Sequence, residues 1–578
     1  MRSLRTLSLV TLTLAPGLAL APAFPTQSPA GDEPARTIPR LLEAGDVPGL
    51  SIAVIRDGRV TWTGAFGTRG DSARSPVNEE TIFSAASLSK PVFAYVVLRL
   101  AERGALDLDE PLATHLEYPR LAHDERYRAI TPRMVLSHGT GLPNWGGDRL
   151  ELQFDPGTGF NYSGEGFVYL QKTVERITGL SLEELARREV FEPLGMRRSS
   201  YVWRDAFEGN ATYGKNWAAR FEHVVRYEEP NAAFSLLTTA GDYARFATAV
   251  LAGEGFAQET LREMIAPQRA ARRPQRPTPA DEHVSWGLGW GLQVGRAGRA
   301  IWHWGDNGRF KAYVVAYPET GDGVVYFANG QEGLSIAEAI VQSVAPDDHW
   351  ALRWLDYDRY DDPQRLARKA VERAALEGGA DAALARYAET RRNPAARLGP
   401  RAAENLAEFL REYDLDAAAR RVLELAVEDH PDSVRAHVNW AEALLGAGEY
   451  EGAIAVSRHV RGIAPELAEE TDRRIRWIEA RIAAREAPVS VPAETLARYG
   501  GDYGPRHVRL EGGTLYYQRD GNREYRLIPM AHDLFALDGL ETFRIRFARD
   551  DSGRVAKIVG LYIDGSEDET ERTDGPAP

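Results

Sequence analysis

Residues 87–103 read SLSKPVFAYVVLRLAER, and this stretch decides how the chain is interpreted. Its apolar residues recur with helical spacing, so Ser87–Arg103 is expected to form a helix. Ser87 and Lys90 then stand three residues apart on one face at its start, where the amine can reach the hydroxyl. A serine hydroxyl is a weak nucleophile and needs an adjacent base. Lysine can be that base if burial lowers its pKa, whereas arginine stays protonated.

The composition narrows the chemistry further. The chain has only six lysines among 70 basic residues, so the use of lysine instead of arginine at position 90 favours a base over a surface charge. Cysteine is absent, which excludes disulfides, thiolate metal sites and a cysteine nucleophile. We expect no metal and no other cofactor, because no His-Glu-x-x-His pair occurs and the twelve histidines show no ligand spacing. The net charge of −14 makes nucleic acid a poor partner.

The segments around the helix indicate a sheet domain. Residues 49–67 alternate apolar and polar side chains around Asp57-Gly58, as in a β-hairpin. A mixed, helix-rich stretch follows, and strand patterns return over residues 286–329. We therefore expect a mixed α/β domain over residues 24–346, built as an antiparallel sheet with a helical insertion.

Four more segments accompany Ser87 and Lys90 in a fixed order. They are LSHGTGLP (136–143), DPGTGFNYS (155–163), TAGDYARF (239–246) and WHWGDNG (302–308). Together the five segments resemble the class C β-lactamase-like serine hydrolases, which include penicillin-binding proteins, esterases and S12-type peptidases. The resemblance covers about residues 40–345 and implies the serine β-lactamase-like fold.

The resemblance also implies catalytic roles. Ser87 attacks the substrate and becomes acylated, while Lys90 is the base. Tyr162, expected to be kept partly ionised by nearby positive charge, relays a proton to the leaving group. His303 is expected to line the opposite wall of the site.

The resemblance assigns the oxyanion hole to the backbone N–H groups of Ser87 and Asp306, and Gly305 is expected to leave room for the substrate. Two substrate-binding positions depart from the family pattern. Gly164 replaces an asparagine that would bind a substrate carbonyl, and Trp304 replaces the threonine of a Lys-Thr-Gly segment. Both departures weaken polar recognition of a β-lactam and favour an ester or a peptide.

Tryptophans near these motifs are candidates for an aromatic acyl pocket, with the hydrophobic core as the alternative; they are Trp145, Trp286, Trp290 and Trp304. Trp304 alternates with His303 along its strand, so for Trp304 too the core is an alternative. His138 lies in a glycine-rich loop and is expected to be structural.

The second half changes to Ala, Arg, Glu and Leu. We expect a helical linker over residues 347–397 and helical repeats over 398–486. Small residues and a proline recur with a 34-residue offset, as Ala407, Ala419 and Pro431 and then Ala441, Ala453 and Pro465. This resembles the tetratricopeptide repeat and implies a surface for a protein partner, or a spacer. An unrelated Ala-rich helical bundle is the alternative.

A linker at residues 487–494 leads into short strands over 495–569, separated by Gly and Asp-Gly turns. About seven such strands indicate a small antiparallel β-barrel or sandwich. It resembles the lipocalin-like domain appended to some serine hydrolases of the same family. Residues 570–578 are expected to be a polar tail. The acidic cluster at residues 567–571 is expected to belong to a solvated tail as well.

Residues 1–23 are expected to be a cleavable signal peptide. Arg2 and Arg5 precede an apolar run, and Ala21-Pro22-Ala23 offers small residues for cleavage. A membrane anchor is the alternative, but the run is shorter than the roughly 20 apolar residues that a span needs. The expected location is therefore periplasmic or secreted, with no stable membrane span.

These features favour a serine hydrolase that works through an acyl-enzyme on Ser87, an esterase or a D-amino-acid peptidase-like enzyme acting on a small ester or peptide. A β-lactamase or D-alanyl-D-alanine carboxypeptidase is one alternative. A weakly catalytic, penicillin-sensor-like binding protein is another. The complete set of Ser87, Lys90 and Tyr162 favours turnover over binding alone.

Overall fold

The computed structural model describes residues 32–273 and 277–573, so the predicted signal peptide lies outside the described residues. The chain forms two compact units. The first combines residues up to Asn216 with Phe221–Tyr357, and the second combines Trp217–Arg220 with the rest of the chain from Asp358. In the ranges that the structure describes, no helix is long and apolar enough to cross a membrane.

The first unit is built on an antiparallel sheet of eight strands in the order β2-β1-β12-β11-β10-β9-β8-β7. The predicted hairpin at residues 49–67 is confirmed, and its turn places Asp57 and Gly58 at positive φ, as a two-residue hairpin turn requires. The strands are β1 (Gly49–Arg56), β2 (Arg59–Gly67), β7 (Arg269–Ala270), β8 (Val284–Trp286), β9 (Gly291–Gly295), β10 (Gly298–Asp306), β11 (Lys311–Tyr317) and β12 (Asp322–Ala328). Pairing of β1 with β12 joins the two ends of the domain.

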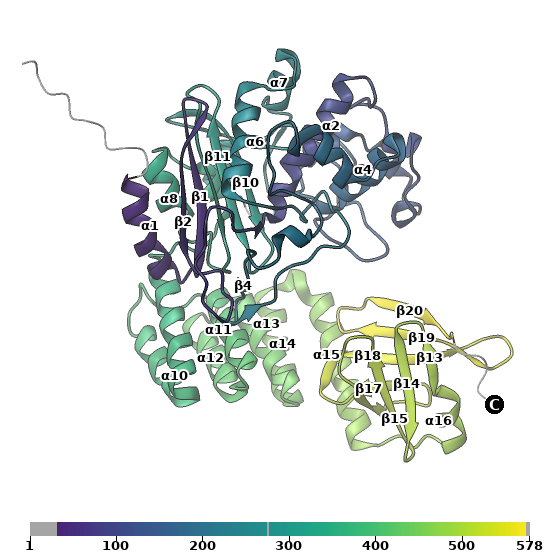
Figure 1. Cartoon of the computed structure of the whole chain (residues 1–578). Helices are drawn as coiled ribbons and strands as arrows, with labels where there is room; N and C mark the ends of the chain where they lie inside the picture. Colours follow the sequence, from purple (N-terminus) through teal and green to yellow (C-terminus); the bar gives the residue numbers. More distant parts are fainter. Residues whose placement is uncertain (1–31, 274–276, 574–578) are drawn as a thin grey trace, which may run out of the picture. The chain divides into compact units, whose positions relative to one another are not determined.

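Helices cover both faces of this sheet (Figure 1). On one side lie α1 (Asp32–Gly45) and α8 (Ala337–Val344), and on the other lies α6 (Ala240–Ala252). The insertion between the strands holds α2 (Ser89–Glu102) and α4 (Gly164–Thr178). The predicted helix at residues 87–103 is thus confirmed, although α2 is buried almost all round instead of on one side. Such a helix belongs to the centre of a domain, and here it directly follows the turn that carries Ser87.

The first unit ends at Tyr357, beyond the expected boundary at residue 346. The short helix α9 (Trp350–Leu355) packs back onto it. Trp354 is 2% exposed, its ring centroid lies 5.8 Å from that of Trp302, and its Nε1 donates to the Ala271 carbonyl at 2.8 Å. Burial of this indole makes the start of the expected linker part of the domain.

The second unit begins with helices, and Figure 1 shows them as successive antiparallel pairs. They are α10 (Pro363–Arg391), α11 (Pro400–Glu412), α12 (Asp416–Asp429), α13 (Val434–Gly446), α14 (Tyr450–Ile463) and α15 (Ala468–Glu486). The short helix α16 (Ala493–Tyr499) packs instead on the strands that follow it. The repeated alanines Ala407, Ala419, Ala441 and Ala453 are all buried. Small buried residues at equivalent positions let neighbouring helices approach, as the repeat pattern predicts.

The second unit ends in an antiparallel sheet whose strand order follows the chain, β13 to β20. The strands are β13 (Gly501–Tyr503), β14 (Arg506–Glu511), β15 (Thr514–Arg519), β16 (Tyr525–Pro529), β17 (Leu534–Leu537), β18 (Leu540–Arg549), β19 (Val555–Tyr562) and β20 (Glu567–Glu571). The Thr573 N–H donates to the Asp502 carbonyl at 2.8 Å, which brings the segment just after β20 to β13. The sheet is therefore a nearly closed barrel.

The acidic cluster at residues 567–571 is a strand of this barrel, so the expectation of a solvated tail is wrong. β20 pairs with β19, and consecutive acidic side chains of β20 find basic partners on other strands. Asp568 forms an ion pair with buried Arg506, and Glu569 lies 2.5 Å from Lys557 Nζ. Pairing of the carboxylates with these cations offsets their mutual repulsion in the strand.

Candidate active site

Ser87 lies on a tight turn that leads into α2. Ala86 just before it has φ 48°, a left-handed conformation that is uncommon for a residue with a side chain. The turn is held from behind, because Tyr243 Oη donates to the Leu88 carbonyl at 3.0 Å and Tyr201 Oη donates to the Ser89 carbonyl at 2.7 Å. Within residues 81–90, Ser87 alone is not buried. The turn therefore presents one hydroxyl to the site.

Lys90 is placed to act on that hydroxyl. Its Nζ lies 3.1 Å from Ser87 Oγ and donates to the Ala233 carbonyl at 2.9 Å. The side chain is fully buried, and burial lowers the pKa of Lys90 to about 7 because the charged ammonium is poorly solvated there. A substantial share of the amine is therefore neutral at physiological pH and can accept a proton.

Tyr162 completes the predicted set. Lys90 Nζ lies 4.8 Å from the centroid of the Tyr162 ring, and the phenol hydroxyl is buried near Ser87 without a hydrogen bond of ordinary geometry between them. Burial raises the pKa of Tyr162 well above its usual value, more than the Ser87 hydroxyl lowers it. The expectation of a partly ionised Tyr162 is therefore wrong for the free site, where the phenol is neutral.

The His138 ring packs against the ring of Tyr162, in agreement with the expected structural role of His138. Its ring centroid lies 4.3 Å from that of Tyr162, and its Nδ1 accepts a hydrogen bond from the Ser163 N–H at 3.0 Å. Burial and the charge of Lys90 lower the pKa of His138 well below its usual value. A neutral imidazole in this position fixes the phenol without competing for its proton.

His303 and Trp304 exchange the places that were expected for them. His303 is fully buried, whereas Trp304 is partly exposed and its ring centroid lies 4.5 Å from that of Tyr162. The Nδ1 of His303 lies 2.8 Å from the Trp304 carbonyl, which can only accept, so Nδ1 carries the proton. Burial and Lys90 lower the pKa of His303 to about 3, so it is neutral. Trp304, and not His303, forms the open wall of the site.

Gly305 lets β10 approach the nucleophile turn. A Cβ at this position would lie 2.4 Å from the Ala85 carbonyl oxygen, so any larger residue would push the strand away. The carboxylate of Asp306, the next residue, forms an ion pair with Lys311 and accepts from Tyr357 Oη at 2.6 Å. These contacts fix the end of β10. The oxyanion role of the Ser87 and Asp306 N–H groups stays a prediction.

The other predicted positions divide between site and core. Trp286 and Trp290 are fully buried and belong to the core, so they do not line a pocket. Trp145 is 49% exposed and lies against Gly164, whose missing side chain leaves room for the indole. Tyr357 and the Ala233 carbonyl were not predicted. The ion pair between Asp306 and Lys311 was also missed. The turn residues Asn307-Gly308 could have indicated it, because a hairpin there pairs these two residues across β10 and β11.

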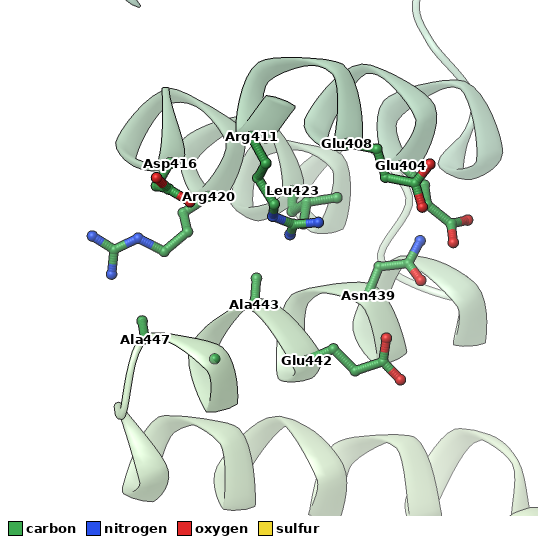
Figure 2. A pocket seen from close by; sticks show the side chains of 11 residues that line it. Glu404, Glu408, Arg411, Asp416, Arg420, Leu423, Asn439, Glu442, Ala443 and Ala447 are labelled. Carbon is green, nitrogen blue, oxygen red and sulfur yellow. The ribbon is translucent and has the colours of Figure 1, made fainter. Parts of the chain in front are cut away.

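A hollow lies in the helical repeats, with a volume of about 590 Å³ (Figure 2). Asn439 projects from α13 into it, opposite Glu404 and Glu408 of α11. Its lining residues are Glu404, Glu408, Arg411, Asp416, Arg420, Leu423, Asn439, Glu442, Ala443, Gly446 and Ala447. Nothing in this set resembles the hydroxyl and amine pair of the first unit, so Ser87 and Lys90 remain the candidate catalytic pair.

Comparison with known proteins agrees with this geometry. The profile of the Beta-lactamase family matches residues 34–344, which include Ser87, Lys90, Tyr162 and His303. The chain belongs to the beta-lactamase family. The helical repeats and the barrel lie outside the matched residues, so their resemblances to tetratricopeptide and lipocalin-like domains stay predictions.

Proteins whose names point to different activities resemble the chain. Esterase EstB of Burkholderia gladioli is 31% identical over 299 residues, which cover 42% of this chain and 74% of the esterase. Penicillin-binding protein 4* of Bacillus subtilis is 24% identical over 367 residues, covering 56% and 76% of the two chains. A solved class C beta-lactamase aligns with a TM-score of 0.48 at 20% identity, over 55% of this chain and 96% of its own.

Proposed function

We propose that the protein hydrolyses a small ester or a D-amino-acid-containing peptide through an acyl-enzyme on Ser87. The observation that carries this proposal is the 3.1 Å contact between Ser87 Oγ and a buried lysine whose pKa is about 7. A nucleophile beside a neutral base is the minimum that acyl transfer requires. The resemblance to an esterase supports the ester as substrate.

The steps follow from the protonation states. Neutral Lys90 takes the Ser87 proton as Oγ attacks the carbonyl carbon, and the backbone N–H groups of Ser87 and Asp306 stabilise the oxyanion. Neutral Tyr162 donates its proton to the leaving group and regains one from protonated Lys90. Water then attacks the acyl-enzyme, with the same groups moving its proton, and Ser87 is restored.

The wall of the site favours an ester over a β-lactam. Trp304 supplies a bulky ring where lactamases carry a hydroxyl, and Gly164 supplies no side-chain amide. A site without these polar partners gains nothing from a polar substrate group. Turnover rates distinguish the alternatives. A β-lactamase or carboxypeptidase turns over its own substrate class faster than an ester, and a slowly acylating binding protein is labelled without turnover.

The test is labelling with a fluorophosphonate, read by intact mass, together with turnover of a small ester and a chromogenic cephalosporin. We expect one adduct on the wild-type protein, none on Ser87→Ala, and a higher kcat/KM for the ester. Ser89→Ala is the matched control for labelling. An adduct that persists in Ser87→Ala would overturn the assignment. Stoichiometric labelling without turnover would favour the binding protein, and a cephalosporin kcat/KM equal to the ester value would favour the lactamase.

Two further proposals rest on the sequence. Export to the periplasm or the medium follows from residues 1–23, and a protein partner for the repeats follows from their resemblance to tetratricopeptide units. The hollow that Asn439 enters supports the second proposal, because it offers charged and amide groups to a polypeptide.

A further inference from the structure

The indole of Trp145 fills the place beside Gly164, two residues after Tyr162. A Cβ at Gly164 would lie 2.6 Å from Cη2 and 2.7 Å from Cζ2 of this ring, closer than real Cβ atoms come. The Gly164 N–H donates to the carbonyl of Asn144 at 3.1 Å and to its side-chain Oδ1 at 3.0 Å. The position of the Trp145 indole therefore depends on the absence of a side chain at Gly164.

The loop that carries Trp145 is fixed on both sides. The Gly146 N–H donates to Oε1 of buried Glu165 at 3.1 Å. Arg120 pairs with the same carboxylate at 2.6 Å and donates to the Gly146 carbonyl at 2.9 Å. Trp145 itself is 49% exposed. A half-exposed ring on a fixed backbone can bind a ligand with little loss of conformational entropy.

Trp145 is the first of three rings along one side of the site, which we call the aromatic edge (Trp145, Phe234 and Tyr227). The Trp145 and Phe234 centroids lie 5.6 Å apart at 74°, and those of Phe234 and Tyr227 lie 5.5 Å apart at 63°. Phe234 directly follows Ala233, whose carbonyl accepts from the base lysine. Tyr227 Oη accepts from Asn307 Nδ2 at 3.0 Å, next to the end of β10. The aromatic edge thus extends from Gly164, two residues after Tyr162, past the carbonyl partner of Lys90 to the end of β10.

We propose that the aromatic edge binds a planar aromatic group on the substrate, and that Trp145 sets this preference. This inference rests on the proposed function of Ser87. Aromatic rings prefer edge-to-face and offset-stacked partners, so a flat ring gains more here than a puckered ring of the same carbon number. The group can belong to the acyl part or to the alcohol part of an ester, and the two parts can be tested separately.

The test uses two matched pairs of esters. Methyl phenylacetate against methyl cyclohexylacetate varies the acyl part, and benzyl acetate against cyclohexylmethyl acetate varies the alcohol part. For the wild-type protein we expect kcat/KM to favour the planar member about fivefold to tenfold in one pair, which identifies the side that binds. Trp145→Leu, which stays apolar, should reduce this ratio to that of alkaline hydrolysis. Gly164→Ala should do the same, because its Cβ displaces the indole.

The control is Trp217→Leu, which removes another exposed tryptophan and should leave the ratio unchanged. Equal rates for both members of both pairs, or a preference that survives in Trp145→Leu, would overturn the inference. Failure of the proposed function looks different, because no ester is then hydrolysed and no fluorophosphonate adduct forms. In that case the same four esters are titrated against Ser87→Ala by NMR. Equal dissociation constants for planar and puckered members would again overturn the aromatic preference.

Discussion

Among single residues, Lys90 shows how burial creates a base. Its ammonium has two neutral oxygen partners, Ser87 Oγ and the Ala233 carbonyl, and it is removed from water. Two neutral partners compensate a lost hydration shell only in part, so the pKa falls to about 7. Arginine could not serve here, because its guanidinium does not lose its proton in this range.

This environment predicts a pH dependence. Protonated Lys90 cannot accept the Ser87 proton, so kcat/KM for an ester should rise about tenfold per pH unit below the pKa of about 7 and level off above it. Lys90→Arg should lose about 10²-fold or more of the activity, while Lys172→Arg is the control and should keep it. A flat pH profile, or an active Lys90→Arg enzyme, would show that Lys90 is not the base.

The neutral state of Tyr162 predicts a dependence on the leaving group. Tyr162→Phe removes the proton donor, so kcat/KM for an alkyl ester should fall about 10²-fold or more. A 4-nitrophenyl ester should suffer less, because 4-nitrophenolate leaves without a proton. Tyr169→Phe, a buried tyrosine of α4 away from Ser87, is the control. An equal loss for both esters would mean that Tyr162 acts on acylation in another way.

At the scale of elements, the proposed oxyanion role requires a fixed position of the Asp306 N–H group at the end of β10. The Asp306 carboxylate fixes it through Lys311 on β11 and Tyr357 after α9. Tyr357→Phe should lower kcat about threefold to tenfold with little change in KM, because the lost hydrogen bond positions a group that acts in the transition state. Tyr360→Phe, three residues on, is the control. A change confined to KM would assign Tyr357 to substrate binding instead.

Elements also show what could be predicted from sequence. The Ser87–Lys90 contact was predictable because it depends on spacing within one turn of a helix, and the first hairpin because Asp57-Gly58 sets its own turn. The orientation of Trp304 was not, since alternation along a strand says that neighbours face opposite sides but not where the site lies. The Ala233 carbonyl and Tyr357 reach the site only through long-range packing. β20 looked like a solvated tail because its buried partner Arg506 is distant in sequence.

For the whole molecule, the question is where the catalytic unit ends. The family match stops at residue 344, yet the compact unit continues to Tyr357. In the added segment, the Trp354 ring centroid lies 6.4 Å from that of Trp286 and 5.8 Å from that of Trp302. These rings pack behind the wall formed by Trp304. The segment therefore supports the site, although it lies beyond the residues that define the family.

Two truncated chains separate these boundaries. A chain that ends after Tyr357 should keep most of the small-ester activity, because it retains the indole of Trp354 and the hydroxyl that holds Asp306. A chain that ends after Asp348 should lose both the activity and thermal stability, since removing a buried indole exposes the ring cluster behind Trp304. Trp354→Ala in the full chain should lower the unfolding free energy by about 3–5 kcal/mol, the usual cost of such a cavity. Melting temperatures and ester kcat/KM, measured together, decide the matter. Full activity in the folded shorter chain would make α9 dispensable, whereas inactivity of both folded chains would show that the second unit contributes to the active enzyme.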